Sequence, residues 1–367
     1  MAKVTLRCWQ LAIPFQSKFT HNQKSRSVSS TFWVQADQEG LVGYGEGCPR
    51  PYVTGETLDH CERFFNRHSE QVSTDVRDLP SLKAYRKDHE MDIAANPAAW
   101  CAIELALLDL IARMQQVSVE QLLDLPDLSG AFQYTGVLGV DAPQAFAQKL
   151  QAHQSLGVRD YKLKWNGDNA SSRVRLEQIQ SAVPGVKVRI DANNLWPTAA
   201  AAIQALKALS ESVWAVEEPL CLPSLQDALQ IAQQTGLAII LDEAVLNERD
   251  LAPYLDYAEH FILNLRVSKC GGLLSSLAMA QHCLDAGMHA VVGAQVGETS
   301  ILSRAALPVA QFLGNHCKAQ EGAYGLLLLE RDVVEQPLQI GKAGVLYPSA
   351  QLGDCGWGLN CDLARLD

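Results

Sequence analysis

Charged side chains end a series of short apolar runs between residues 161 and 298, at intervals of 25 to 29 residues. The series comprises Lys164, Asp191, Glu217, Asp242, Lys269 and Glu298. Acids brought together repel one another unless a cation lies between them or protons are taken up. Several oxygen ligands suit Mg²⁺, with Mn²⁺ as a second candidate, and leave open positions for water or substrate. The pattern predicts one divalent cation held by Asp191, Glu217 and Asp242.

The lysines of this series predict acid/base chemistry. Lys162 and Lys164 are two residues apart, so both would face the interior of a barrel from one strand. Buried lysines are costly, and we expect this pair to have lowered pKa values, which would let Lys164 act as a base. Lys269 would lie across the barrel, so that each lysine could reach one face of the same carbon. Gly271 and Gly272 follow it and would start a helix near an anion.

Each of these residues must be positioned by a strand. An apolar run, a charged end and a helical pattern alternate from about residue 126 to 325, which predicts parallel βα units. Enzymes with such barrels place their chemistry at the carboxyl ends of the strands. We therefore predict an α/β protein whose catalytic domain, residues 126–325, is a (β/α)7β TIM-like barrel.

The segment before the barrel has a different pattern. Three strands near 3–13, 30–36 and 41–47, followed by helices, predict an α+β capping domain over residues 1–125. The Gly-rich tail, residues 326–367, is expected to complete it.

Composition excludes several classes of function. The chain has 367 residues, a net charge of −11 and no basic run, which argues against nucleic acid as a partner. No stretch approaches the roughly 18 apolar residues of a membrane span, and the N-terminus lacks a signal-peptide pattern. Ten cysteines without a Cys-x-x-Cys motif are typical of reduced thiols in a cytoplasm.

Five motifs in order resemble one known family. They are Lys-x-Lys, Asp-x-Asn, Glu-Glu-Pro, Asp-Glu and Lys-x-Gly-Gly, which begin at Lys162, Asp191, Glu217, Asp242 and Lys269. This series resembles the muconate-lactonizing-enzyme (muconate cycloisomerase-like) subgroup of the enolase superfamily, which is related to mandelate racemase. The resemblance covers nearly the whole chain and implies Mg²⁺ on the three acids.

The resemblance also implies roles for single residues. Lys164 and Lys269 would be the acid/base pair, with Lys162 supporting the substrate carboxylate or the basicity of Lys164. Glu218 and Glu243 match positions whose side chains contact the metal ligands without binding the metal themselves. Asn193 would face the same side as Asp191 and support it in the same way.

The implied reaction removes the proton α to a carboxylate and forms a metal-stabilised enolate. Two lysines that flank one carbon permit 1,1-proton transfer, so a racemase or epimerase of an amino-acid derivative or dipeptide is the leading interpretation. The same pair permits a cycloisomerase or syn-dehydratase of the muconate or o-succinylbenzoate type. A Schiff-base lysine aldolase and a non-catalytic barrel stay open as remote alternatives.

The expected substrate is a small carboxylate. The segment 17–29, whose polar composition predicts a loop, and the segment 48–57 are candidate lids. Glu298 could bind a substrate ammonium. Dipeptide epimerases of the subgroup carry Asp-x-Asp on the last strand, where this chain reads KAQEG; Glu321 is the acid that could substitute. Self-association into a homo-oligomer is expected of such barrels.

Overall fold

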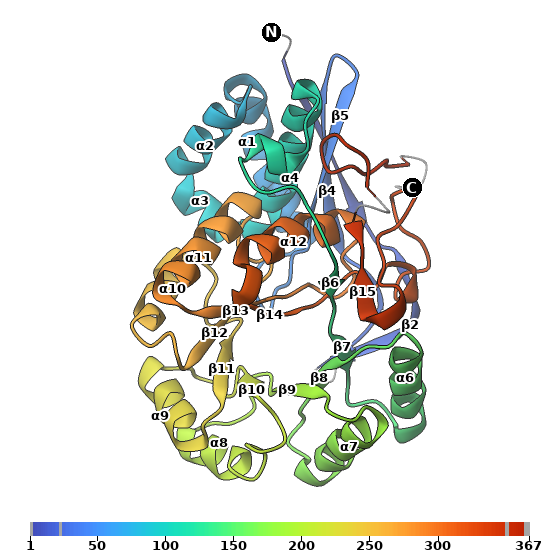
Figure 1. Cartoon of the computed structure of the whole chain (residues 1–367). Helices are drawn as coiled ribbons and strands as arrows, with labels where there is room; N and C mark the ends of the chain where they lie inside the picture. The colour runs from blue at the N-terminus through green and yellow to red at the C-terminus, as the bar shows by residue number, and fades with distance from the viewer. Residues whose placement is uncertain (1–2, 22–23, 349–351, 363–367) are drawn as a thin grey trace.

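The computed structural model describes residues 3–21, 24–348 and 352–362. A three-stranded antiparallel sheet with helices packed against it forms a cap, and eight parallel strands surrounded by helices form a barrel (Figure 1). These elements confirm the predicted (β/α)7β barrel with an α+β cap. None of the described helices combines the length and the apolar composition that crossing a membrane requires.

The cap holds the first five strands and the first five helices. Its sheet has the order β1-β4-β5, beside a separate hairpin of β2 and β3. The strands are β1 (Thr5–Leu11), β2 (Pro14–His21), β3 (Lys24–Val28), β4 (Thr31–Gln38) and β5 (Leu41–Gly47). The helices are α1 (Leu58–Asp75), α2 (Leu79–Asp88), α3 (Glu90–Ala95), α4 (Pro97–Gln115) and α5 (Val119–Leu122).

The hairpin corrects one expectation from the sequence. Residues 17–29 were expected to form a loop, but most of them belong to β2 and β3, which pair antiparallel. Strand pairing is a backbone interaction, and this polar segment lacks the alternation of apolar residues by which a strand is recognised.

Helix α4 lies directly on β5 because the strand presents glycines to it. Gly43, Gly45 and Gly47 face the helix, and a Cβ atom on any of them would lie within 2.3 Å of a backbone oxygen of α4. No side chain larger than hydrogen fits in that space. The helix is buried from its start through Ala112, which explains its apolar sequence.

The barrel strands run in the order β14-β13-β12-β11-β10-β9-β8-β7. They are β7 (Gly136–Leu138), β8 (Asp160–Lys164), β9 (Lys187–Asp191), β10 (Ala215–Glu217), β11 (Ala238–Leu241), β12 (Phe261–Leu265), β13 (His289–Val292) and β14 (Cys317–Gln320). The helices are α6 (Pro143–Ser155), α7 (Asn169–Ala182), α8 (Ala199–Leu206), α9 (Leu225–Thr235), α10 (Glu248–Leu255), α11 (Leu273–Ala286) and α12 (Ser300–Leu313). The Thr135 N–H donates to Gln320 O at 2.8 Å and closes the ring.

Small and β-branched side chains fill one layer inside the barrel. This cluster consists of Ala215, Ile240, Ile262, Val291 and Ala319. This layer fills the barrel interior, so the polar side chains at the strand ends lie on packed apolar side chains.

The tail lies against the cap as well as the barrel. Strand β15 (Val345–Leu346) pairs with β6 (Phe132–Gln133), which precedes the barrel. Farther on, Gly356 O accepts a hydrogen bond from Val119 N at 3.1 Å, and Trp357 N donates to Asp109 Oδ1 at 2.8 Å.

Two buried glutamates of the cap hold the first turns of barrel helices. Glu46 on β5 accepts hydrogen bonds from Thr299 N at 3.0 Å and from Thr299 Oγ1 at 2.7 Å, at the start of α12. Glu104 on α4 accepts from Leu274 N at 3.0 Å, at the start of α11. A Cβ atom on Gly272 would lie 2.3 Å from Glu104 Oε1. The anion expected at this helix start is therefore a carboxylate of the protein.

A buried ion pair joins three segments of the chain. Arg304 on α12 donates to both oxygens of Glu120 on α5 at 2.7 and 2.8 Å, and its Nε donates to Trp357 O in the tail. Removing the acid leaves a buried guanidinium unpaired, so Glu120→Ala is expected to reduce the free energy of unfolding by about 3–5 kcal/mol. Urea denaturation followed by circular dichroism measures this loss.

An exposed ion pair supplies the control for that experiment. Arg249 and Glu90 lie 3.0 Å apart with side chains 66% and 62% exposed. Since exposed pairs contribute about 0–1 kcal/mol, Glu90→Ala should change stability little. Equal losses from the two variants would contradict the role given to Glu120.

Candidate active site

The register of three adjacent strands places the first predicted residues at one level. Lys164 on β8 is opposite Asp191 on β9, and Asp191 is opposite Glu217 on β10. Glu217 pairs with Ile240 on β11, so Asp242 lies two residues beyond it on the same side of the sheet. The structure therefore brings Lys164 and the three predicted metal ligands to the same end of the barrel.

Asp191 is held by two kinds of donors. Its Oδ2 lies 2.5 Å from Lys164 Nζ and 3.2 Å from Lys162 Nζ. Its Oδ1 accepts from the backbone N of Asn193 at 3.0 Å and from Asn193 Nδ2 at 2.6 Å. Asn193 has a φ of 46°, a left-handed conformation that asparagine tolerates. It supports Asp191 as predicted.

Three carboxylates contact the buried ammonium of Lys162. Its Nζ lies 2.8 Å from Glu217 Oε1, 3.2 Å from Asp191 Oδ2 and 3.3 Å from Glu321 Oε1. Burial alone would lower the pKa of Lys162, but the three carboxylates together raise it above its usual value. The expected lowering of this pKa is therefore wrong, and Lys162 is a fixed cation instead of a base.

Glu321 also forms an ion pair with a buried arginine, Arg189. Its Oε1 accepts from Arg189 Nη2 at 2.6 Å, and Arg189 also donates to Asp160 at 2.9 Å. Burial alone would raise the pKa of Glu321, but Lys162 and Arg189 lower it to about 2. Glu321 therefore stays ionised at the edge of the pocket.

The two predicted supporting glutamates occupy different places. Glu218 Oε1 accepts from the backbone N–H of Asp242 at 2.6 Å and of Ala244 at 2.9 Å, so it fixes the strand end that carries Asp242. Glu243 lines the pocket. Burial raises the pKa of each glutamate to about 7.

Lys269 lies buried at the same end of the barrel as the predicted acids. Its Nζ donates to three backbone carbonyls, of Asp242 at 2.7 Å, Asn264 at 2.8 Å and Val245 at 2.9 Å, and its side chain is 0% exposed. Burial lowers the pKa of Lys269. Its Nζ also lies 3.3 Å from Asp242 Oδ1, so Lys269 is placed beside a predicted metal ligand, and its role as an acid/base group stays a prediction.

Arg266 is a pocket residue that the sequence did not predict. It follows β12 directly, lines the pocket, donates to Gln295 Oε1 at 3.1 Å and contacts Asp242. Arg266 directly follows β12, two residues after Asn264, whereas Lys269 lies in the turn beyond the strand.

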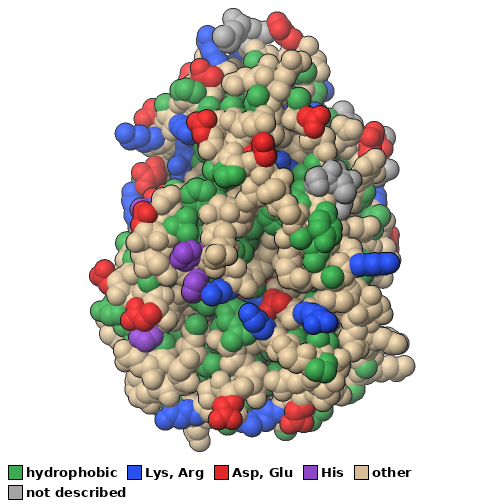
Figure 2. All heavy atoms as spheres, in the orientation of Figure 1, with side chains coloured by type: hydrophobic (Ala, Val, Ile, Leu, Met, Phe, Trp, Pro, Cys, Tyr) green, Lys and Arg blue, Asp and Glu red, His purple; other side chains and the backbone are tan. Residues whose placement is uncertain are grey.

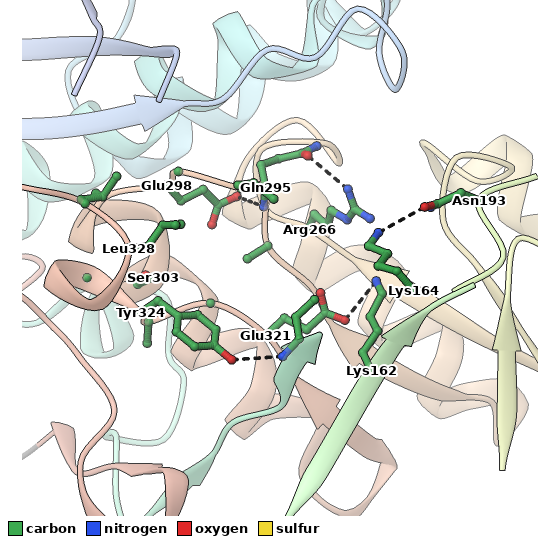
Figure 3. Close-up of a pocket in the computed structure, with 18 of the residues that line it drawn as sticks. Lys162, Lys164, Asn193, Arg266, Gln295, Glu298, Ser303, Glu321, Tyr324 and Leu328 are labelled. Atoms are coloured by element: carbon green, nitrogen blue, oxygen red, sulfur yellow. Dashed lines mark hydrogen bonds and ion pairs between the residues drawn. The ribbon is translucent and has the colours of Figure 1, made fainter. Parts of the chain in front are cut away.

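The pocket is lined by basic groups at one end and apolar groups at the other (Figure 3). Lys162, Lys164 and Arg266 form the basic end. The other end includes Val137, Ala294, Val296, Ala323, Tyr324, Leu328 and Leu329. Glu298 and Ser303 are the polar side chains there, and Tyr52 reaches the pocket from the cap. Outside the pocket, acidic and basic side chains are interspersed over the face of the molecule in Figure 2.

The chemical types of these side chains suit a hard cation, although the described side chains are not arranged around a ready-made metal site. Among the described residues, no three His, Cys, Asp or Glu side chains are arranged to hold a metal ion. Lys162, Lys164 and Arg266 contact the acids instead. Glu217 Oε2 and Asn264 Oδ1 are nonetheless buried oxygens that have no hydrogen-bond partner within the described part of the chain. Carboxylate and amide oxygens are the ligands that Mg²⁺ prefers, so the donor set fits.

Acids and lysines at the carboxyl ends of barrel strands define a class of enzymes that act on carboxylates. Two family models match the chain: the mandelate racemase / muconate lactonizing enzyme N-terminal domain over residues 1–124, and the enolase C-terminal domain-like family over residues 145–365. The chain belongs to the enolase superfamily, and within it to the group that resembles mandelate racemase and muconate lactonizing enzyme. The predicted family is confirmed.

Curated relatives of the chain are isomerases. A hydrophobic dipeptide epimerase from Enterococcus faecalis is 31% identical over 79% of this chain and 81% of that protein. An N-succinyl-L-Arg/Lys racemase from Bacillus cereus is 24% identical over 84% of each chain. A solved structure of a dipeptide epimerase from Enterococcus faecalis, complexed with Mg and the dipeptide L-Leu-L-Tyr, is 26% identical with a TM-score of 0.82. It covers 98% of this chain and 100% of that one.

Proposed function

We propose that this protein is a Mg²⁺-dependent racemase or epimerase that removes the proton α to the carboxylate of a dipeptide or other amino-acid derivative. The observation that carries the proposal is Lys164, a lysine that lines the pocket while its amine contacts Asp191. The activities of the relatives support the reaction class. All ten cysteines are free thiols, which supports a reducing, cytoplasmic location.

Asp191, Glu217 and Asp242 would hold the divalent cation, with Mn²⁺ as a substitute for Mg²⁺. The bound cation would polarise the substrate carboxylate and offset the charge that develops on it. Lys162 adds a fixed positive charge beside the same acids, because three carboxylates keep it protonated. Lys164 takes the α-proton on its amine, while the electron pair of the broken C–H bond remains in the enolate, and Lys269 as the second acid/base group would return a proton to the opposite face.

Exchange of the α-hydrogen for deuterium tests this proposal. Dipeptides, N-acylated amino acids and acid sugars are incubated with the enzyme and Mg²⁺ in D₂O, and loss of the α-proton signal is followed by NMR. We expect exchange with at least one dipeptide or N-acylated amino acid. If no carboxylate exchanges, or if borohydride traps a substrate adduct on a lysine, the proposal fails.

One observation also favours a second candidate function. Lys269 donates to three backbone carbonyls, whereas Lys164 lines the pocket. Cycloisomerases and syn-dehydratases need one base on one face of the substrate. Conversion of muconolactone or of an o-succinylbenzoate precursor, without inversion of any α-carbon, would favour this candidate.

The apolar end of the pocket suggests how the rest of the substrate binds. Leu328 and Tyr324 offer contacts to an apolar side chain, and Glu298 offers an acid to an ammonium. Glu298 Oε1 accepts from Gln295 N at 2.6 Å, which fixes the carboxylate in the wall. The N-terminal ammonium of a dipeptide could therefore pair with Glu298, which would take the role of the Asp-x-Asp motif that this chain lacks. Glu321 is a second acid of the same pocket.

The pH dependence of binding tests this role of Glu298. Burial raises the pKa of Glu298 to about 7, so its carboxylate gains charge as pH rises through that value. The KM of a dipeptide, whose amine stays protonated up to about pH 7.5, should fall between about pH 6 and 7.5. Glu298→Gln should remove this dependence and raise KM about 10-fold or more.

An N-acylated amino acid is the control, because it carries no ammonium at that place. Its KM should change little between wild type and Glu298→Gln. Equal effects on both substrates would show that Glu298 only shapes the pocket.

A further inference from the structure

Four charged side chains alternate in sign inside the barrel and end at the pocket. They are Asp160, Arg189, Glu321 and Lys162. Arg189 Nη1 lies 2.9 Å from Asp160 Oδ2, and Arg189 Nη2 lies 2.6 Å from Glu321 Oε1. The same Glu321 oxygen lies 3.3 Å from Lys162 Nζ. Because Glu321 follows β14 and the other three belong to β8 and β9, these ion pairs join the last barrel strand to β8 and β9.

Arg189 is fully buried, and acids balance its charge. Its side chain is 0% exposed, and its Nη1 also donates to Thr135 Oγ1 at 3.3 Å. A guanidinium stays protonated in proteins, and a buried charge is tolerated where oppositely charged groups contact it. Arg189 therefore holds Glu321 as a permanent cation.

Glu321 is an acid whose charge is already balanced. Lys162 and Arg189 contact one of its oxygens, and Figure 3 shows its carboxylate directed at Lys162. Burial alone would raise the pKa of Glu321, yet the two cations lower it to about 2. An ammonium that approached from the pocket would meet a carboxylate flanked by two positive charges, which repel it. Glu321 is therefore a poor acceptor for the amine of a substrate.

Glu298 is an acid of the same pocket whose charge is less well balanced. Its Oε1 accepts from the Gln295 N–H at 2.6 Å. Burial raises the pKa of Glu298 to about 7, and this hydrogen bond and the charges of Arg50 and Arg266 offset only part of the rise. A substrate ammonium would supply the positive charge that Glu298 lacks. Without an ammonium, the carboxyl group can take up a proton instead.

We infer that Arg189 is a positioning residue that sets the substrate specificity of the pocket, because it holds Glu321 beside Lys162 and withholds this carboxylate from the substrate. A free amine then binds at Glu298. A substrate without an amine leaves no unbalanced charge, since Glu321 is already paired and Glu298 can be protonated. The enzyme should therefore accept N-acylated amino acids as well as dipeptides. This inference rests on the proposed function.

Two substrates that differ by one amine test the inference. L-Leu-L-Tyr carries the amine, and 4-methylpentanoyl-L-tyrosine is the same molecule with hydrogen in its place. The full-length enzyme with Mg²⁺ in D₂O receives each in turn, and NMR gives kcat/KM for exchange of the α-proton beside the carboxylate. The ratio of the two kcat/KM values does not depend on how much of the enzyme is folded. We expect the wild type to exchange both substrates.

Variants of the two acids show which one binds the amine. Glu321→Gln should lower both kcat/KM values by about the same factor, because the change in charge beside Lys162 is the same for either substrate. Glu298→Gln should lower the value for L-Leu-L-Tyr alone, by at least about 10-fold.

Variants of Arg189 test its own part. Arg189→Met combined with Asp160→Asn removes both charges and frees Glu321 on that side, so the ratio should rise about 5-fold or more in favour of L-Leu-L-Tyr. Arg189→Lys keeps a cation, and Asp160→Asn alone keeps Arg189 on Glu321, so neither should move the ratio. A merely structural role of Arg189 would change both substrates equally, and circular dichroism reports the folded fraction.

Three results would overturn the inference while the proposed function survives. One is failure of either substrate to exchange while another carboxylate does. Another is selective loss of L-Leu-L-Tyr exchange in Glu321→Gln. The third is an unchanged ratio in the folded variant that combines Arg189→Met with Asp160→Asn. Absence of exchange with every carboxylate tested would overturn the proposed function and this inference with it.

Discussion

Replacing Lys164 with methionine is expected to slow exchange of the substrate α-hydrogen by about 10²–10⁴-fold, the usual contribution of a general base. Lys164 is the base of the proposed mechanism, and its amine lies at the pocket wall, beside Asp191 and Asn193. Methionine keeps most of the side-chain volume and removes the amine, so folding should change little. NMR in D₂O measures the exchange, and calorimetry on the inactive variant shows whether the substrate still binds.

The neighbouring strand supplies a matched control. Lys187 begins β9 at the opposite end of the barrel and is exposed. Lys187→Met should exchange substrate at the wild-type rate. If Lys164→Met retains wild-type exchange as well, the base is another residue and the proposed mechanism is wrong.

Removing divalent cations should abolish exchange, and Mg²⁺ should restore it. The acids that would hold the ion contact lysines and an arginine, and Glu217 keeps one buried oxygen without a hydrogen-bond partner. Glu217→Gln removes a charge from this set, so Mg²⁺ binding measured by calorimetry should weaken at least about 10-fold.

Calorimetry keeps this prediction independent of turnover. Glu177, an exposed residue on α7, is the matched control, and Glu177→Gln should bind Mg²⁺ as the wild type does. Wild-type affinity in Glu217→Gln would exclude Glu217 as a ligand, whatever the activity of the variant.

The barrel, and the site residues on β8, β9 and β10, could be predicted because the sequence pattern that indicates them is local. Charged residues recur at intervals of 25 to 29 because each βα unit has that length, and β8, β9 and β10 end at Lys164, Asp191 and Glu217, whereas Lys269 and Glu298 lie in turns beyond β12 and β13. Register then follows from parallel pairing, which places Lys164, Asp191 and Glu217 at one level. The spacing of Lys162 and Lys164 likewise places both side chains inside.

The opposite side of the site could not be predicted in the same way. Beyond the end of β12 the chain leaves the alternation of a strand, so the direction of Lys269 depends on the carbonyls around it. The pKa of Lys162 depends on acids from three other strands, whose combined effect exceeds that of burial. Both properties arise from contacts between segments far apart in the chain.

The glutamates at the starts of α11 and α12 have a consequence for any attempt to divide the protein. Family models match the two parts separately, over residues 1–124 and 145–365. Yet Glu46 and Glu104 belong to the first part, and the helices that they cap belong to the second. Residues 126–367 produced alone would start two helices with unsatisfied amides. We expect such a fragment to aggregate, and coexpression with residues 1–125 to recover it.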